Sequence, residues 1–168
     1  LHQEFESEAR AHPLALPQVS SRHELACGAE LAYEDALLSP GLAPPALDRA
    51  YGNYVSLKDG AIRMDGVPDS PFSYVAQLPP ATLSPGTALV VQGQLFEGGI
   101  TIGLLKNDAW YATVNVPRPG DVDVVVAVGE QGIYTPVISA VMSGPNQRLR
   151  FALPRIGFVG VPSTGSAR

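Results

Sequence analysis

Cysteine and histidine, two side chains that often serve in nucleophilic and acid–base catalysis, are few in this chain and lie near its start. The only cysteine is Cys27, and the three histidines are His2, His12 and His23. A single thiol cannot form an internal disulfide, and it cannot build a structural zinc site by itself. The rest of the chain therefore offers no His-based or Cys-based catalysis unless the N-terminal segment folds back onto it.

Carboxylates are more numerous, and six lie in or near expected turns: Asp65, Asp69, Glu97, Asp121, Asp123 and Glu130. Glycosidase chemistry needs two carboxylates about 5–9 Å apart, and nothing in the sequence selects Glu97 with Asp108 or Glu130 as such a pair. The spacings match no EF-hand loop, so a structural calcium ion is an alternative that we do not favour over solvated turn acids. Because nucleophile-elbow, phosphate-loop and metalloprotease motifs are also missing, we expect no catalytic residues and no cofactor.

Side chains that could bind a ligand are more numerous, and they occupy the polar alternate positions of several expected strands. Amide, hydroxyl and guanidinium groups around an aromatic ring suit a neutral polyol, because they pair with hydroxyls while the ring covers the C–H face. The candidate ligand-binding residues are Tyr111, Asn115, Gln92, Gln94 and Arg148. The alternative is that these side chains belong to the solvated outer faces of two different sheets.

Trp110 is the only tryptophan, and strand alternation assigns it to the core. It shares its phase with the apolar Ala112 and Val114, whereas Tyr111 shares its phase with the polar Thr113. Successive side chains of a strand point to opposite faces. The pattern therefore predicts that Trp110 is buried and that Tyr111 is exposed for recognition, with an ordinary surface tyrosine as the alternative.

Short strands are the elements that would carry these residues. From about Gly52, apolar runs separated by turn residues recur roughly every 8–12 residues, which is typical of a β-sandwich or barrel. Lys58-Asp59-Gly60 predicts a hairpin turn, and the valine-rich run 121–128 predicts a strand with little water on either face. Tyr74 and Leu78 are expected on one face. Roughly nine or ten strands without helices between them predict an antiparallel, jelly-roll-like β-sandwich.

The N-terminal part has a different texture. Residues 1–50 are rich in proline and show no alternation, so we predict an N-terminal arm or linker there. The sandwich is expected over 51–161 and a flexible tail over 162–168. The segment 21–38 fits either a short helix or an extended arm, and the sequence leaves both open. The acidic start has no signal-peptide run, and a first residue other than Met suggests an excised or processed piece.

Composition limits the classes of partner. The chain has 168 residues, 45% hydrophobic and 16% charged, which suits one globular domain. Its 11 Lys+Arg against 16 Asp+Glu give a net charge of −5, and this disfavours nucleic acid, whose binding needs a positive field. No stretch approaches the roughly 20 apolar residues of a spanning helix. We therefore expect neither a nucleic-acid partner nor a membrane.

Five short motifs suggest a family resemblance. They are Leu89-Val-Val-Gln-Gly-Gln-Leu95, Gly99-Ile-Thr-Ile-Gly-Leu-Leu105, Ala109-Trp-Tyr111, Pro119-Gly-Asp121 and Gly132-Ile-Tyr-Thr-Pro-Val137. With them, the segment from Tyr74 to Phe158 resembles non-catalytic jelly-roll modules of the carbohydrate-binding kind. The resemblance implies a sandwich fold, a glycan ligand and attachment to a glycan-processing enzyme.

The leading hypothesis is a non-catalytic, ligand-binding accessory domain whose favoured ligand class is a glycan. Its partners would be that glycan or the remainder of a larger parent protein. The alternative is a structural or oligomerisation domain, since the apolar stretch from Leu25 to Leu47 and exposed strand edges could pair with a second copy. An enzyme of unrecognised type is a third, less favoured class.

Overall fold

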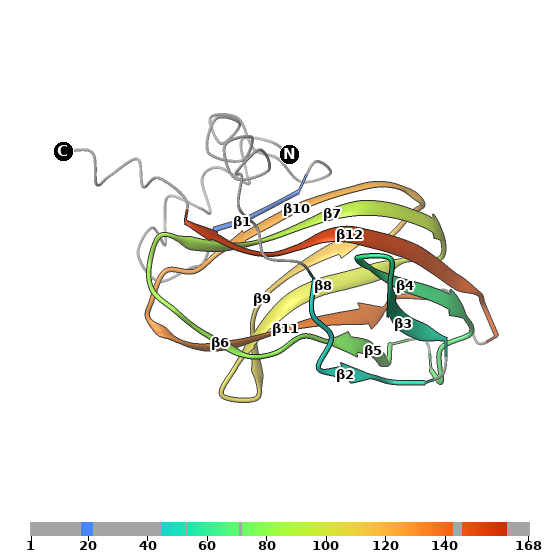
Figure 1. Cartoon of the computed structure of the whole chain (residues 1–168), viewed down its shortest axis with the longest axis horizontal. Helices are drawn as coiled ribbons and strands as arrows, with labels where there is room; N and C mark the ends of the chain where they lie inside the picture. Colours follow the sequence, from blue (N-terminus) through green and yellow to red (C-terminus); the bar gives the residue numbers. More distant parts are fainter. Residues whose placement is uncertain (1–17, 22–44, 53, 71, 143–145, 161–168) are drawn as a thin grey trace.

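Two antiparallel β-sheets pack face to face in the computed structural model, which describes residues 18–21, 45–52, 54–70, 72–142 and 146–160 (Figure 1). This arrangement confirms the predicted antiparallel β-sandwich. The described residues contain no helix that is long and apolar enough to cross a membrane. The helix considered over 21–38 falls, apart from Ser21, outside the described residues, as does the tail 162–168.

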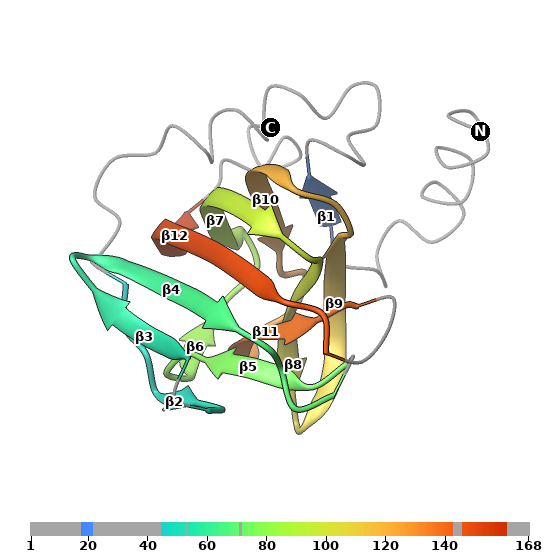
Figure 2. The ribbon, with the colours of Figure 1, turned by 90° about the vertical axis from the view of Figure 1, so that its right-hand side faces the viewer.

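Twelve strands make up the two sheets within the described residues. They are β1 (Gln18–Ser21), β2 (Arg49–Ala50), β3 (Val55–Lys58), β4 (Ala61–Gly66), β5 (Tyr74–Gln77), β6 (Ala81–Leu83), β7 (Thr87–Glu97), β8 (Ile100–Lys106), β9 (Ala109–Val116), β10 (Gly120–Ala127), β11 (Gly132–Ala140) and β12 (Leu149–Gly160). The first sheet has the order β1-β10-β7-β12-β4-β3. The second has the order β2-β5-β11-β8-β9, with β6 also paired to β11 (Figure 2).

The core lies between the sheets and follows the alternation of each strand. In β10, Val122, Val124 and Val126 join the core, while Val125 points to the outer face and is still buried. β10 lies between β1 and β7. On its outer face Asp121 is exposed and Asp123 and Ala127 are half-buried, so the prediction of little water on either face is confirmed only around Val125. β1 comes from the segment expected to be an arm, and it adds a strand to the edge of the first sheet.

Two tight hairpin turns connect neighbouring strands as their sequences favour. Asp59 and Gly60 both have positive φ, of 54° and 74°, which confirms the turn predicted between β3 and β4. Asn107 and Asp108, with φ of 55° and 63°, form the corresponding turn between β8 and β9. Two successive residues of positive φ match the right-handed twist of the flanking strands.

A β-bulge in β9 reverses the predicted orientation of its aromatic residues. Leu104 pairs with Ala112, but Leu105 pairs with Trp110, so Tyr111 is an extra residue opposite a regular β8. An extra residue shifts the alternation by one position. Trp110 therefore points away from the core and is 42% exposed, and the prediction that it is buried is wrong.

A second irregularity has the same effect in β5. Ser139 of β11 pairs with Tyr74, whereas the residue before it in β11 pairs with Ala76, so Val75 is the extra residue. Val75 and Ala76 both contribute to the core, and Tyr74 lies on the outer side. The expectation that Tyr74 and Leu78 share a face is therefore wrong, because Leu78 is a core residue.

Close contact between β7 and β12 gives a test of the first sheet. A Cβ on Gly93 would lie 2.2 Å from the carbonyl oxygen of Ala152 and 2.8 Å from the Cα of Leu153. We expect Gly93→Ala to lower the free energy of unfolding by about 1–3 kcal/mol, since the strands would have to separate. Urea unfolding followed by Trp110 fluorescence measures this, with Gly160→Ala, where a Cβ meets nothing within 4 Å, as the control. Equal midpoints for the two variants would contradict the packing.

Candidate ligand-binding surface

Three aromatic side chains lie in a row on the outer face of the second sheet. The ring centres of Trp110 and Tyr74 are 5.7 Å apart with an angle of 71° between the ring planes. Tyr51, which directly follows β2, lies 5.9 Å from Tyr74 at 84°. The guanidinium of Arg49 sits 4.5 Å from the centre of the Tyr51 ring. These edge-to-face contacts are a favoured geometry for aromatic pairs, and we call Trp110, Tyr74 and Tyr51 the aromatic row.

The strands beneath the aromatic row fix its position. A Cβ on Gly103 of β8 would lie 2.7 Å from the Trp110 ring, so the indole lies directly over this glycine. Val137 of β11 pairs with Gly103 on one side and with Gln77 on the other. It is fully buried although it lies outside the inter-sheet core. The Tyr51 hydroxyl donates a hydrogen bond to Gln77 Oε1 at 3.1 Å, which anchors the far end of the aromatic row.

Polar side chains lie beside the aromatic row on the same outer face, toward one end of β8 and β9. Tyr74 pairs with Ser139, Ser139 pairs with Thr101, and Thr101 pairs with Asn115, so the four residues cross the sheet in one line. Thr101 Oγ1 donates a hydrogen bond of 2.6 Å to Asn115 Oδ1. Asn115 is exposed, and its amide nitrogen provides donors at the surface. Of the five predicted ligand-binding residues, Asn115 is the one that shares a face with the aromatic row.

Tyr111 lies on the opposite side of β9, where it contacts the core. Its ring packs edge to face on Tyr134 at 5.0 Å, and its hydroxyl accepts a hydrogen bond of 2.9 Å from the Gly129 amide. Tyr111 is therefore half-buried against the core, and the prediction that it is exposed is wrong. The bulge that turns Trp110 outward is the physical reason.

The end of the core beside Tyr111 is closed by a small polar cluster. The Tyr134 hydroxyl donates to the carbonyl oxygen of Glu130 at 2.7 Å, and burial together with the neighbouring Tyr111 raises the pKa of Tyr134. Lys106 Nζ lies 5.6 Å from the Tyr134 ring centre and forms an ion pair of 3.1 Å with Glu130. This cluster joins the end of β8 to the turn after β10, which is a structural role.

Gln92 and Gln94 belong to the first sheet and so lie across the sandwich from Asn115. Gln92 Nε2 donates to Asp123 Oδ1 at 3.3 Å, and Gln92 Oε1 accepts a hydrogen bond from Arg155 Nη1. Both the nitrogen and the oxygen of the Gln92 amide are therefore hydrogen-bonded to residues of neighbouring strands. Gln94 is half-buried two residues further along β7. Gln92 and Gln94 thus lie on a different sheet from Tyr111 and Asn115.

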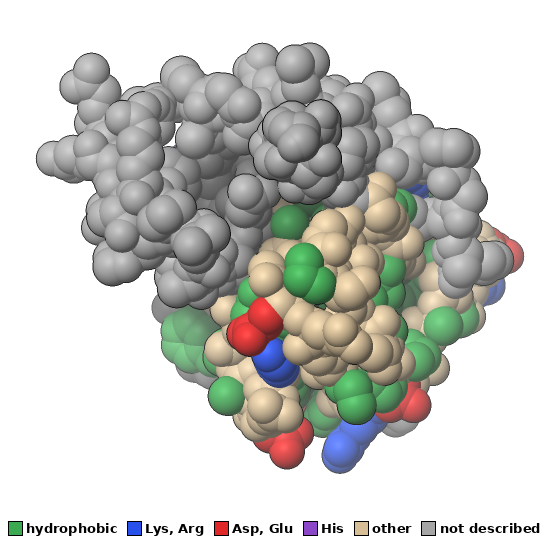
Figure 3. Space-filling view, turned by 90° about the vertical axis from the view of Figure 1, so that its left-hand side faces the viewer, with side chains coloured by type: hydrophobic (Ala, Val, Ile, Leu, Met, Phe, Trp, Pro, Cys, Tyr) green, Lys and Arg blue, Asp and Glu red, His purple; other side chains and the backbone are tan. Residues whose placement is uncertain are grey.

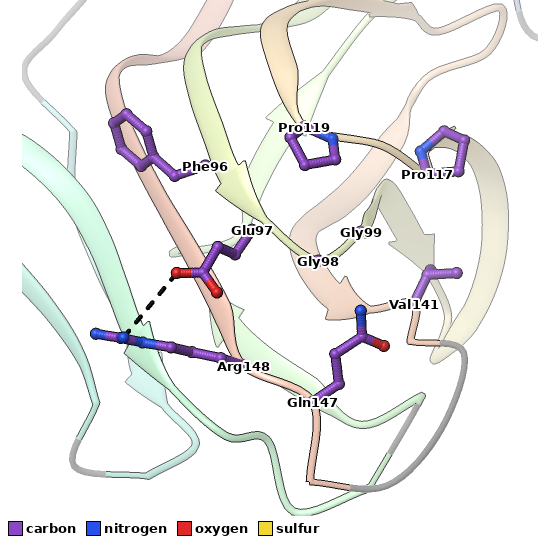
Figure 4. Close-up of a pocket in the computed structure, with 9 residues that line it drawn as sticks. All are labelled: Phe96, Glu97, Gly98, Gly99, Pro117, Pro119, Val141, Gln147 and Arg148. Atoms are coloured by element: carbon purple, nitrogen blue, oxygen red, sulfur yellow. Dashed lines mark ion pairs between the residues drawn. The ribbon is translucent and has the colours of Figure 1, made fainter.

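Arg148 lies at a third location, beside a pocket at one end of the sandwich (Figure 4). The pocket has a volume of about 380 Å³. Its lining residues are Phe96, Glu97, Gly98, Gly99, Pro117, Pro119, Val141, Gln147 and Arg148. Arg148 Nε and Nη2 lie 2.7 and 2.5 Å from Asp65 Oδ1, and this hydrogen bonding raises the pKa of the guanidinium. Nη1 of the same group is 4.0 Å from Glu97 Oε1.

The candidate carboxylate pairs do not meet. Glu97 precedes β8 and Asp108 follows it, so the length of this strand, about 20 Å for seven residues, separates them. Glu130 is paired with Lys106 at the Asp108 end of β8. Neither partner can therefore face Glu97 across one glycosidic bond. No group of three or more His, Cys, Asp or Glu side chains that could hold a metal ion was found in the described ranges.

The visible surface carries charges of both signs in a dispersed pattern. In the space-filling view of Figure 3, hydrophobic side chains lie scattered among polar atoms, and acidic and basic side chains occur singly or side by side. Neither sign gathers into a broad patch among the described residues on this face.

Comparison with protein-family models, curated proteins and solved structures found no match to this chain. The fold and the surface alone therefore define its class. It is an antiparallel β-sandwich with an aromatic row on the outer face of one sheet, in which Trp110 is exposed and Tyr74 and Tyr51 are half-buried.

The structural role of Tyr111 can be tested separately from any ligand. Tyr111→Phe removes the acceptor of the Gly129 amide and should lower the free energy of unfolding by about 1 kcal/mol. Tyr74→Phe is the matched control, because no hydrogen bond of the Tyr74 hydroxyl occurs among the described residues. Urea unfolding measures both changes. A Tyr111→Phe variant as stable as the parent protein would contradict this assignment.

Proposed function

We propose that this domain is a non-catalytic ligand-binding module and that its ligand is a glycan bound on the outer face of the second sheet. The observation that carries the proposal is the aromatic row, in which Trp110 remains 42% exposed. Pyranose rings present apolar C–H surfaces, and an aromatic side chain held in place offers them a contact at little entropic cost.

Polar groups on both sides of the aromatic row complete a surface suited to hydroxyl groups. Arg49 lies at the Tyr51 end, while Thr101, Thr113 and Asn115 lie on the same face of β8 and β9. Hydroxyl and amide side chains both donate and accept hydrogen bonds, as sugar hydroxyls require. Because the whole chain carries a net charge of −5, a neutral glycan fits this surface better than a polyanion.

Binding to such an open face should be weak for short ligands. Few polar groups contact the ligand and only part of its surface is buried. The favourable contacts therefore exceed the entropic cost of binding by only a small margin. We expect a Kd on the order of 0.1 mM for an oligosaccharide of a few units. Longer chains that contact the whole aromatic row should bind more tightly.

Trp110→Ala is the direct test. After a glycan array, electrophoresis through gels that contain soluble neutral polysaccharides, such as xylan, galactomannan and mixed-linkage glucan, measures affinity. We expect Trp110→Ala to weaken binding at least about tenfold, since its ring supplies the main apolar contact. Phe72→Ala is the matched control, because Phe72 is 71% exposed and lies outside the aromatic row. Retained binding in Trp110→Ala, or no retardation of the folded parent protein, would overturn the proposal.

A structural or oligomerisation role is the second candidate. The observation that favours it is the end strands of the two sheets, β1 and β3 in the first and β2 and β9 in the second. Each has a hydrogen-bonded neighbour on one side only along the strand order of the described part of the chain. An exposed edge can pair with a second copy. Light scattering over a range of concentrations tests this: a mass that rises above 17.7 kDa supports assembly, and a constant monomer mass counts against it.

A further inference from the structure

We propose that the pocket between the β7–β8 turn and Arg148 is a second binding site, which takes one neutral sugar unit through two adjacent hydroxyl groups. This inference rests on the proposed function, that the domain binds glycans. It concerns a different part of the molecule, because none of the three aromatic-row residues lines the pocket.

The pocket is built by three chain segments that approach closely. Its walls come from the β7–β8 turn, the β9–β10 turn and the two ends of the connection between β11 and β12 (Figure 4). A Cβ on Gly99 would lie 2.7 Å from the Val141 carbonyl oxygen and 3.0 Å from that of Pro117. Gly98 has a φ of +84°, which side-chain-bearing residues rarely adopt. Two successive glycines thus permit the turn to lie between the other two segments.

Two charged groups in the pocket have hydrogen-bonding capacity that they do not use on each other. Arg148 Nη1 and Glu97 Oε1 are 4.0 Å apart, which is too long for a hydrogen bond. Asp65 holds Arg148 through Nε and Nη2, so the guanidinium is fixed and Nη1 is directed at Glu97. One hydroxyl of a vicinal pair can donate to the carboxylate while the other accepts from Nη1.

The local charge and the apolar walls favour a neutral ligand. Among the lining residues the charged groups are the carboxylate of Glu97 and the guanidinium of Arg148, and their charges cancel. A ligand of either sign therefore gains little net attraction. Pro117 and Pro119 provide apolar surface for the C–H groups of a sugar ring. The volume of about 380 Å³ falls within the range of small-ligand sites, about 300–1,000 Å³.

The two surfaces have separate spectroscopic reporters, which makes the experiment specific. The probes are individual neutral monosaccharides, namely glucose, galactose, mannose, xylose and fucose, titrated into the ¹⁵N-labelled full chain. We expect one of them to shift the Gly98 and Gly99 amide resonances while the single indole N–H, from Trp110, moves little. Glu97→Gln should weaken this binding at least about tenfold, because a charged acceptor is lost. Glu130→Gln is the matched control, since Glu130 is outside the pocket lining and should leave the affinity unchanged.

The outcomes distinguish the pocket from the aromatic row. If none of the monosaccharides shifts Gly98 or Gly99, or if Glu97→Gln binds as the parent does, the pocket inference is overturned. Polysaccharide binding that depends on Trp110 would still stand in that case. If monosaccharide shifts at the pocket persist while Trp110→Ala leaves polysaccharide binding intact, the aromatic-row proposal fails and the pocket inference survives.

Discussion

The orientations of Trp110 and Tyr111 on the second sheet both depend on one bulge in β9. With a regular register, Trp110 would enter the core and Tyr111 would reach the surface, because strand side chains alternate. The extra residue at Tyr111 exchanges the two. Tyr111 then closes the end of the core against Tyr134, and Trp110 lies over Gly103. The irregularity at Val75 turns Tyr74 outward in the same way, and the two rings meet across β8 and β11.

The features that could be predicted from the sequence are those that neighbouring residues along the chain determine. Turn residues with positive φ at Asp59 and Gly60 and the valine-rich β10 led to the correct fold class and to one correct hairpin. A bulge is defined by how the residues of two strands pair, so it cannot be read from one strand alone. β9 also contains no glycine or proline that would indicate it. Counting alternate positions along β9 alone therefore assigned Trp110 and Tyr111 to the wrong faces. Asn115 follows the bulge, and its exposure was expected.

The pocket depends on contacts that local patterns do not encode. Gly98 and Gly99 lie in the turn between β7 and β8. The close approach of Gly99 to Pro117 and Val141 joins positions 18 and 42 residues away along the chain. Likewise, Gln92 was a candidate for recognition because its phase is polar, but Asp123 and Arg155 from neighbouring strands use its amide. The sequence shows which side chains need hydrogen-bond partners. Only the order of strands in the sheet shows whether neighbouring residues of the protein provide those partners.

The aromatic row and the pocket are connected by the same two strands. Thr101 is two residues from Gly99 along β8, and Asn115 is two residues from Pro117 along β9, a rise of about 7 Å in each case. The hydrogen-bonded pair of Thr101 and Asn115 thus lies between the two surfaces. On the proposed function, a single extended glycan that engages both would gain from the high effective concentration of its second contact. Weak individual sites on a rigid sheet would then suffice for retention on a polymer, where a free monosaccharide would dissociate quickly.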